Sequence, residues 1–241
     1  MKMHMKLISA LLILVLMMAA LSGCRSKNEK TMSPEELKAK WQIGNYVTFG
    51  KYPQTSSGKY KTPIEWRILE QNGDEAILLS KYALDAKPYN KERHDTSWEK
   101  CTLRAWLNDD FYNKAFSSKE KKQIVKSDVS ADRNPQYGTD PGNATQDKVY
   151  LLSINEANQY LPARSARECV PTDYALKNGA QISEDWHTSD GRNSCIWWLR
   201  TLGISKFIAV YVEVDGDVDA YGHGVEVAVF AARPVIRVKI F

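Results

Sequence analysis

The chain has 241 residues, of which 43% are hydrophobic and 26% charged, and its formal net charge is +4. This length and composition suit one globular domain with its own core. Lys and Arg are interleaved with Asp and Glu and do not form the clustered basic stripe that phosphate backbones require, so we expect no nucleic-acid partner.

Residues 1–23 have the pattern of an export signal. Lys2 and Lys6 precede an apolar run, residues 7–20, which is short for a membrane span of about 20 residues. Leu21-Ser22-Gly23-Cys24 follows and resembles the bacterial lipobox, whose cysteine is acylated and becomes the new N-terminus. We therefore predict a lipoprotein signal peptide, with lipid on Cys24 holding an extracytoplasmic protein to the membrane. The alternative is an ordinary secretory signal cleaved nearby.

Residues 24–42 are predicted to form a lipidated tether with one short helix. The stretch 25–30 is polar and suits a spacer. Ser33 can cap a helix, Pro34 suits its first position, and Glu36 completes a capping box. A globular domain over residues 43–241 follows.

The first half of that domain alternates strands and short helices. A strand is expected at 45–51, and a hairpin joins 64–70 to 75–80 through Asn72-Gly73-Asp74, a strong turn signal. The second hairpin strand is apolar on both faces and should be central. Further predictions are helices from Thr102, Ser117 and Ser153, a strand at 148–152, and polar loops at 127–146 and 179–193.

The stretch from residue 195 to the end predicts the sheet that buries the core. Residues 207–214, 225–229 and 234–240 each place apolar side chains at alternate positions, which is typical of half-buried strands. An antiparallel meander is the most economical assignment. The chain is therefore predicted to be α+β, with a mainly antiparallel sheet and short helices.

Several short motifs occur in an order that resembles a known family. They are Gly44-Asn45-Tyr46-Val47-Thr48-Phe49-Gly50-Lys51-Tyr52, Pro63-Ile64-Glu65-Trp66-Arg67-Ile68-Leu69, Leu78-Leu79-Ser80, Leu103-Arg104-Ala105-Trp106-Leu107-Asn108, Val149-Tyr150-Leu151-Leu152-Ser153, Trp197-Trp198-Leu199-Arg200 and Val229-Phe230-Ala231-Ala232-Arg233-Pro234. This succession resembles DUF6273, an uncharacterised domain of bacterial, often cell-surface proteins, over residues 43–240. It also looks like the C-type-lectin-like fold. The resemblance implies an extracytoplasmic domain and transfers no catalytic residue.

Three arginines lie beside large apolar residues: Arg104, Arg200 and Arg233. They can form an anion-binding cluster, but the favoured interpretation is structural, with each guanidinium bonding carbonyls and carboxylates to lock helices to the sheet. Trp106 and Trp197 suit core filling. Since Trp197 and Trp198 are neighbours in a strand, they should point to opposite faces, which leaves Trp198 as a candidate ligand platform.

With Cys24 acylated, three cysteines remain. A disulfide between Cys169 and Cys195 is the preferred pairing, although the sequence does not establish the connectivity. Cys195 and His187 can be imagined as a thiol nucleophile and its base, but their spacing matches no catalytic motif. The cysteines also lack metal-ligand spacing, so no metal site is expected from them.

Six polar residues after the predicted turn have the spacing of a calcium loop: Asp215, Asp217, Asp219, Tyr221, His223 and Glu226. Ala220 stands where the sharp turn of such a loop needs glycine, and the flanks read as strands. A polar hairpin tip is therefore favoured over calcium at the Asp215 to Glu226 loop, and no other cofactor is expected.

Display outside the membrane and aromatic residues in loops favour a ligand-binding domain. The expected ligand is a glycan, a peptide or another envelope component, and the candidate contacts are Trp186, His187, Trp198, Asp215 and Asp217. The alternatives are an enzyme that acts on cell-envelope material and a structural subunit of an envelope assembly. No residue is assigned a catalytic role.

Overall fold

The computed structural model describes residue 36 and residues 39–240. The chain divides into two units, Met1–Ala39 and Lys40–Phe241. In the first unit the described residues Glu36 and Ala39 are helical, whereas the predicted signal, Cys24 and Ser33 lie outside the described residues. Within the described ranges, no helix has the length and apolar character needed to cross a membrane.

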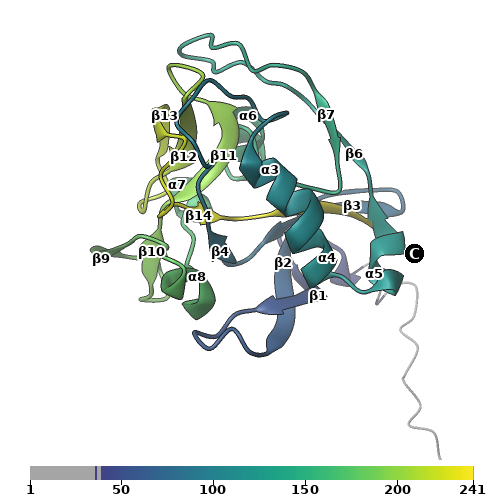
Figure 1. The fold of residues 1–241 in the computed structure, drawn as a ribbon. Helices are drawn as coiled ribbons and strands as arrows, with labels where there is room; N and C mark the ends of the chain where they lie inside the picture. The colour runs from purple at the N-terminus through teal and green to yellow at the C-terminus, as the bar shows by residue number, and fades with distance from the viewer. Residues whose placement is uncertain (1–35, 37–38, 241) are drawn as a thin grey trace, which may run out of the picture. The chain divides into compact units, whose positions relative to one another are not determined.

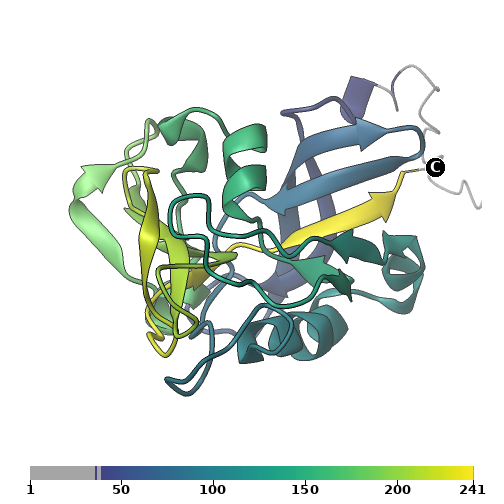
Figure 2. The same cartoon turned by 90° about the horizontal axis from the view of Figure 1, so that it is seen from above.

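The first sheet of the second unit is antiparallel throughout. Its strands follow the order β1 (Tyr46–Pro53), β2 (Lys61–Asn72), β3 (Glu75–Ser80), β15 (Val235–Lys239) and β5 (Ile124–Val125), and β8 (Val149–Tyr150) also pairs with β15. The predicted hairpin around Gly73 is confirmed, and so is the central position of β3, which lies between β2 and β15 (Figure 2).

The second sheet holds most of the C-terminal stretch. Its order is β13 (Val218–Gly224), β12 (Ile208–Val212), β11 (Trp197–Leu202), β14 (Ala231–Ala232) and β4 (Asp85–Ala86), and only the β11–β14 pair is parallel. Two small antiparallel pairs join β6 (Ser127–Val129) to β7 (Thr145–Asp147) and β9 (Ile182–His187) to β10 (Asn193–Cys195).

The predicted three-strand meander is wrong. Its first turn is correct, because β12 and β13 form a hairpin through Gly216. Residues 225–229, however, form turns, and the last strand, β15, leaves this sheet to pair with β3 in the first one (Figure 1). Alternation shows that a strand is half-buried, but it does not say which strand is its partner. In the structure β15 pairs with the apolar β3 and so gives it a neighbour on its second edge.

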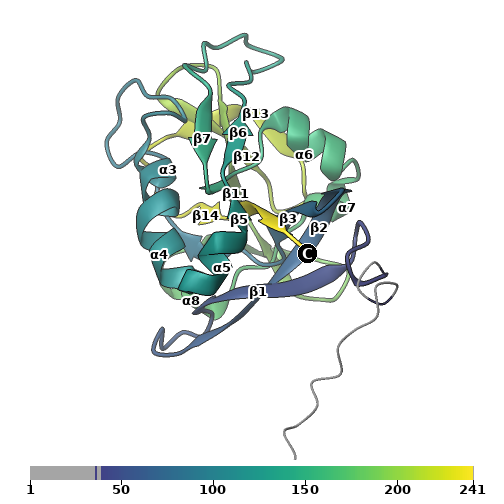
Figure 3. The same cartoon turned by 90° about the vertical axis from the view of Figure 1, so that its right-hand side faces the viewer.

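Short helices cover the sheets. The segment α3 (Thr102–Trp106), π-helix η1 (Leu107–Phe111) and α4 (Tyr112–Ala115) is continuous, and α5 (Ser118–Gln123) follows it. Figure 3 shows these helices on one side of β15 and α6 (Ile154–Tyr160) on the other. Ser117 and Ser153 both form the predicted capping boxes. With α7 (Arg164–Arg167) and α8 (Asp173–Lys177), the architecture is α+β, mainly antiparallel, as expected.

Both neighbouring tryptophans of β11 lie in the core, which corrects the expectation for Trp198. Every residue of β11 is buried, because other elements cover both faces of this strand. The ring of Trp198 packs 4.6 Å from Phe230, and its Nε1 donates to the Lys87 carbonyl at 2.9 Å. Trp198 is fully buried and therefore offers no surface to a ligand.

Candidate functional site

The predicted ligand-binding residues do not form one site. Trp186 and His187 are exposed on β9, as expected of contact residues. Asp215 and Asp217, at the β12–β13 turn, both pair with Arg164, at 3.2 and 3.0 Å. Together with the burial of Trp198, this leaves Trp186 and His187 as the exposed aromatic pair of the original set.

Two of the three candidate arginines are structural. Arg104 pairs with the buried Asp147 at 2.7 Å and donates to the Glu99 carbonyl at 2.9 Å, which ties α3 to β7. Arg200 is bound by Glu156 of α6 and also donates to the Leu151 carbonyl at 2.9 Å. Each guanidinium thus joins a helix to a strand or to the segment beside one.

Arg233 has different surroundings. It is 4% exposed and lies between β14 and β15. Its Nε donates to the Ser80 carbonyl at 3.0 Å and its Nη1 to the Arg167 carbonyl at 3.3 Å. These acceptors are neutral, and within the described part of the chain no carboxylate pairs with this guanidinium. Burying such an uncompensated charge is costly.

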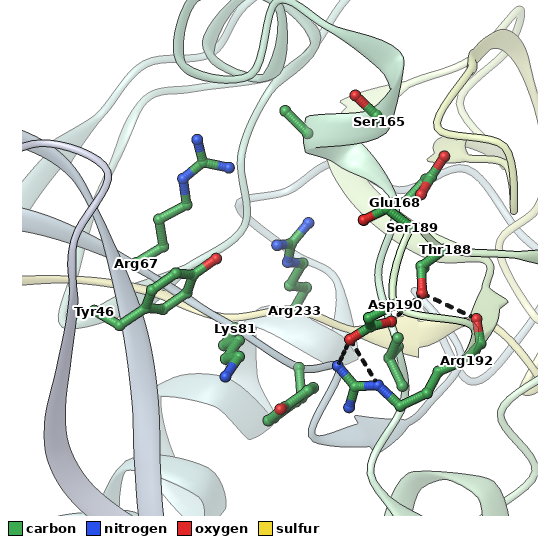
Figure 4. Close-up of a pocket in the computed structure, with 13 residues that line it drawn as sticks. Tyr46, Arg67, Lys81, Ser165, Glu168, Thr188, Ser189, Asp190, Arg192 and Arg233 are labelled. Carbon is green, nitrogen blue, oxygen red and sulfur yellow. Dashed lines mark hydrogen bonds and ion pairs between the residues drawn. The ribbon is translucent and has the colours of Figure 1, made fainter.

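Arg233 points into a pocket of about 200 Å³. Figure 4 shows its guanidinium between Tyr46 and Arg67 on one side and residues 188–192 on the other. The pocket is lined by Tyr46, Arg67, Lys81, Tyr82, Ser165, Ala166, Glu168, Val170, Thr188, Ser189, Asp190, Arg192 and Arg233. The walls come from β1, β2, the segment after β3, α7 with the residues that follow it, the β9–β10 turn and the link between β14 and β15, so six separate parts of the chain build it.

Local geometry fixes two walls of this pocket. Tyr46 and Arg67 face each other as register partners of β1 and β2. Arg67 lies between the buried Trp66 and Ile68, and because strand side chains alternate, it projects away from the core. On the opposite wall, Asp190 accepts hydrogen bonds from Thr188 and Arg192 within the β9–β10 turn.

Two of the four cations that line the pocket have carboxylate partners. Arg192 and Thr188 hold the pKa of Asp190 down, at about 2, so this pair stays ionised. Lys81 pairs with Glu65 at 3.0 Å. Arg67, like Arg233, has no carboxylate at ion-pair distance in the described ranges. The pocket therefore holds two positive charges that are not paired with acidic side chains.

Cys169 lies next to this charge. Burial raises the pKa of its thiol, but a hydrogen bond with Cys195 and the positive charges of Arg233 and Arg192 outweigh burial and lower the pKa to about 7. The thiolate of Cys169 is thus a negative group that interacts electrostatically with Arg233. Its degree of ionisation changes the charge that the pocket presents.

The predicted disulfide partners are neighbours. Cys169 and Cys195 are both buried free thiols in the structure, and their side chains form a hydrogen bond. The backbone N–H of Cys195 also donates to the Cys169 carbonyl at 2.8 Å. Burial raises the pKa of the Cys195 thiol well above its usual value, which is the opposite of what a nucleophile with His187 as its base requires.

The residues spaced like a calcium loop do not surround a common point. Asp215 lies at the turn before β13 and Glu226 lies beyond its other end, with the extended β13 strand between them. Asp215 pairs with Arg164, and Glu226 pairs with Arg93 at 3.3 Å. Among the described residues, no group of three or more acidic, histidine or cysteine side chains could hold a metal ion.

Sequence reasoning missed most of this pocket. Of its lining residues only Arg233 was singled out, and with a structural role. The available signal was the charged Arg67 in the middle of a strand between two large apolar residues. That pattern shows an outward-facing side chain, but nothing local shows that this side chain faces residues 188–192.

Comparison with known proteins identifies the family of this chain but not an activity. A family model described as "Domain of unknown function (DUF6273)" matches residues 73–240. This range covers β3 to β15 and includes Arg233 and the β9–β10 turn, whereas Tyr46 and Arg67 precede it. No curated protein and no solved structure matches the chain.

Proposed function

We propose that this chain, which belongs to the DUF6273 family, is an extracytoplasmic lipoprotein that binds a small anionic group in the pocket of Arg67 and Arg233. The ligand is a carboxylate or phosphate carried by an envelope component such as a peptide or glycan. The observation that carries this proposal is the buried guanidinium of Arg233, which faces a pocket and has no acidic partner in the described part of the chain.

The chemistry of the lining suits such a group. Guanidinium groups present several donors in a plane and bind carboxylate or phosphate through paired hydrogen bonds. Hydroxyl donors from Tyr46 and Ser165 lie around the same space (Figure 4). Since Arg233 is already withdrawn from water, its attraction for an anion is screened less than that of an exposed arginine.

The pocket volume limits what enters. About 200 Å³ is below the roughly 300 to 1,000 Å³ of pockets that enclose drug-sized ligands. The pocket therefore takes the charged end of a ligand, while the rest of the molecule lies outside it. Trp186 and His187 are exposed on β9, directly before Thr188 of the pocket wall. As neighbours in a strand they point to opposite faces, so only one of them is proposed to contact that outer part.

Calorimetry on the full acylated chain in detergent tests the site. Acetate and inorganic phosphate are titrated at constant ionic strength, with chloride as the background ion. Arg67→Gln removes one unpaired positive charge and should weaken binding at least tenfold. The matched control is Arg93→Gln, another partly exposed arginine, whose partner is Glu226 outside the pocket. Equal affinities for wild type and Arg67→Gln would contradict the proposal.

The anchor has its own test. Mass spectrometry of the protein from membranes should show an N-terminus at Cys24 carrying acyl chains, and Cys24→Ser should abolish that mass. Two or three acyl chains hold a domain firmly on a bilayer, because each buried methylene contributes about 0.8 kcal/mol. An intact leader on the mature protein would contradict this part of the proposal without affecting the anion site.

A further inference from the structure

A second and larger cavity lies elsewhere on the domain. Its volume is about 410 Å³, and it shares no lining residue with the pocket of Arg233. The cavity is lined by Tyr52, Asp85, Lys87, Trp106, Asp109, Asp110, Asn113, Lys114 and Tyr174. This volume falls within the usual range of small-molecule sites.

One helical segment supplies most of the polar wall. Trp106, Asp109, Asp110 and Asn113 are three, four and seven residues apart, which places them on one helix face. The π-helix η1 runs through this stretch, and π-helical turns are frequent at functional sites. The amide of Asn113 donates to Asp109 at 2.8 Å, so these two side chains hold each other in position.

Two lysines already occupy the aromatic faces. Lys87 Nζ lies 5.0 Å from the centre of the Trp106 ring and 3.5 Å from Asp85. Lys114 Nζ lies 5.0 Å from the Tyr52 ring and 5.3 Å from the Tyr174 ring. An incoming cation would meet these ammonium groups at the ring faces that would otherwise attract it.

An anion is disfavoured as well. The lining holds three carboxylates, Asp85, Asp109 and Asp110, against the two lysines. Asp85 is buried and already accepts hydrogen bonds from Tyr52 at 2.9 Å and from Asn178 at 2.8 Å. The hydrogen-bonding groups that are left for a ligand are the acceptors on the neighbouring Asp109 and Asp110 and the donors on the two lysines and Asn113.

We infer that this cavity binds a neutral sugar, a hexopyranose unit. A sugar hydroxyl donates one hydrogen bond and accepts others, so neighbouring hydroxyls match a wall where carboxylates alternate with ammonium and amide groups. Because Lys87 and Lys114 lie over the rings of Trp106 and Tyr174, the sugar is held by its hydroxyl groups on the polar wall and not by stacking on these rings. The ligand is uncharged, which separates this site in chemistry as well as in place from the anion pocket.

The test is saturation-transfer NMR on the full chain with D-glucose, D-galactose and N-acetyl-D-glucosamine, each added alone. At least one sugar should receive saturation from the protein. Asp110→Ala should reduce that transfer at least fivefold with an unchanged melting temperature, because Asp110 is exposed and contributes little to the fold. The matched control is Asp74→Ala, an exposed aspartate in the β2–β3 turn, which should leave the transfer unchanged.

Three results would overturn the inference. They are no saturation transfer to any of the three sugars, equal transfer in wild type and Asp110→Ala, and binding of a zwitterion such as free alanine here in place of the sugars. A second variant, Asn113→Ala, should weaken the binding of the same sugar. It shows whether the effect depends on the cavity wall or on Asp110 alone. Arg67→Gln should leave sugar binding unchanged, so failure of the anion site and failure of this one are distinguishable.

Discussion

Arg233 and Trp197 share one hydrogen-bond acceptor. The Arg167 carbonyl accepts from Trp197 Nε1 at 3.0 Å and from Arg233 Nη1 at 3.3 Å, and the guanidinium lies 5.0 Å from the centre of the Trp197 ring. A fully buried indole therefore holds the guanidinium in place. Such a preorganised cation loses little conformational entropy when an anion binds.

The first prediction concerns Arg233 itself. Arg233→Met keeps most of the apolar stem but removes the charge, so phosphate should no longer raise the melting temperature of the variant. In the wild type, phosphate at a hundred times its dissociation constant should stabilise the fold by about 2.7 kcal/mol. Thermal unfolding with and without phosphate measures the difference.

The control for this prediction is Arg237→Met. Arg237 lies in β15, close to Arg233 in sequence, and pairs with Glu75 at 3.6 Å outside the anion pocket. This variant should keep the full phosphate-dependent shift. A phosphate shift that survives in Arg233→Met would show that the buried guanidinium does not bind the ligand.

The second prediction is a pH dependence set by Cys169. As the pH rises through about 7, the Cys169 thiol ionises and its thiolate partly neutralises Arg233. Acetate stays fully ionised over this range, so its affinity for the reduced protein should fall between pH 6 and pH 8. Calorimetry at several pH values measures this, and Cys169→Ala should give a flatter profile. A wild-type profile as flat as that of the variant would show that the thiol does not affect the site.

The same thiol affects stability with a defined sign. Its pKa in the folded protein, about 7, is lower than its usual value of 9.0. Between these values the unfolded chain binds more protons than the folded one, so the free energy of unfolding should rise with pH from about 7 to 9. The contribution is lost as the pH falls through about 7. Urea unfolding of reduced wild type and Cys169→Ala should show this rise in the wild type only.

The third prediction compares two capping boxes. Glu156→Ala removes the glutamate bond of the α6 capping box and also the main partner of the buried Arg200, so it should lower the free energy of unfolding by about 3 kcal/mol. Glu120→Ala removes the equivalent glutamate of the α5 capping box, which accepts hydrogen bonds from Ser117 and the Gly50 N–H, and should cost about 1 kcal/mol. Urea unfolding measures both. Equal losses of unfolding free energy in the two variants would mean that the ion pair between Arg200 and Glu156 contributes little to stability.

The fourth prediction concerns Gly216, at the β12–β13 turn. Its φ is +79°, and an added Cβ would collide with the backbone carbonyl of Arg164 in α7. Gly216→Ala should therefore displace α7, whose Ser165 and Ala166 line the anion pocket, and should weaken both stability and acetate binding. Gly73→Ala is the control, because its φ is +59° and its Cβ would meet nothing within 4 Å. This control should cost only about 1 kcal/mol of backbone strain and leave binding unchanged.

Prediction from the sequence succeeded where the interactions are short in range. The Asn72-Gly73-Asp74 turn and the capping boxes of Ser117 and Ser153 involve groups at most a few residues apart, so composition and spacing identify them. The α+β class follows from the same local patterns. Charged residues inside apolar segments need acceptors wherever they lie, and Arg104 and Arg200 both contact carboxylates and carbonyls.

The sequence by itself therefore determined many of the local elements and the fold class, and it predicts an exported, lipid-modified chain. The tertiary structure alone decided that β15 completes the first sheet, that Trp198 is covered, and that Arg67 meets Arg233 across a pocket. The reason is that side-chain alternation reports burial without naming the partner. Strand pairing and the packing of two sheets bring together residues that are far apart in the chain. Arg67 and Arg233, which have no carboxylate partner among the described residues, therefore face one pocket only in the folded protein.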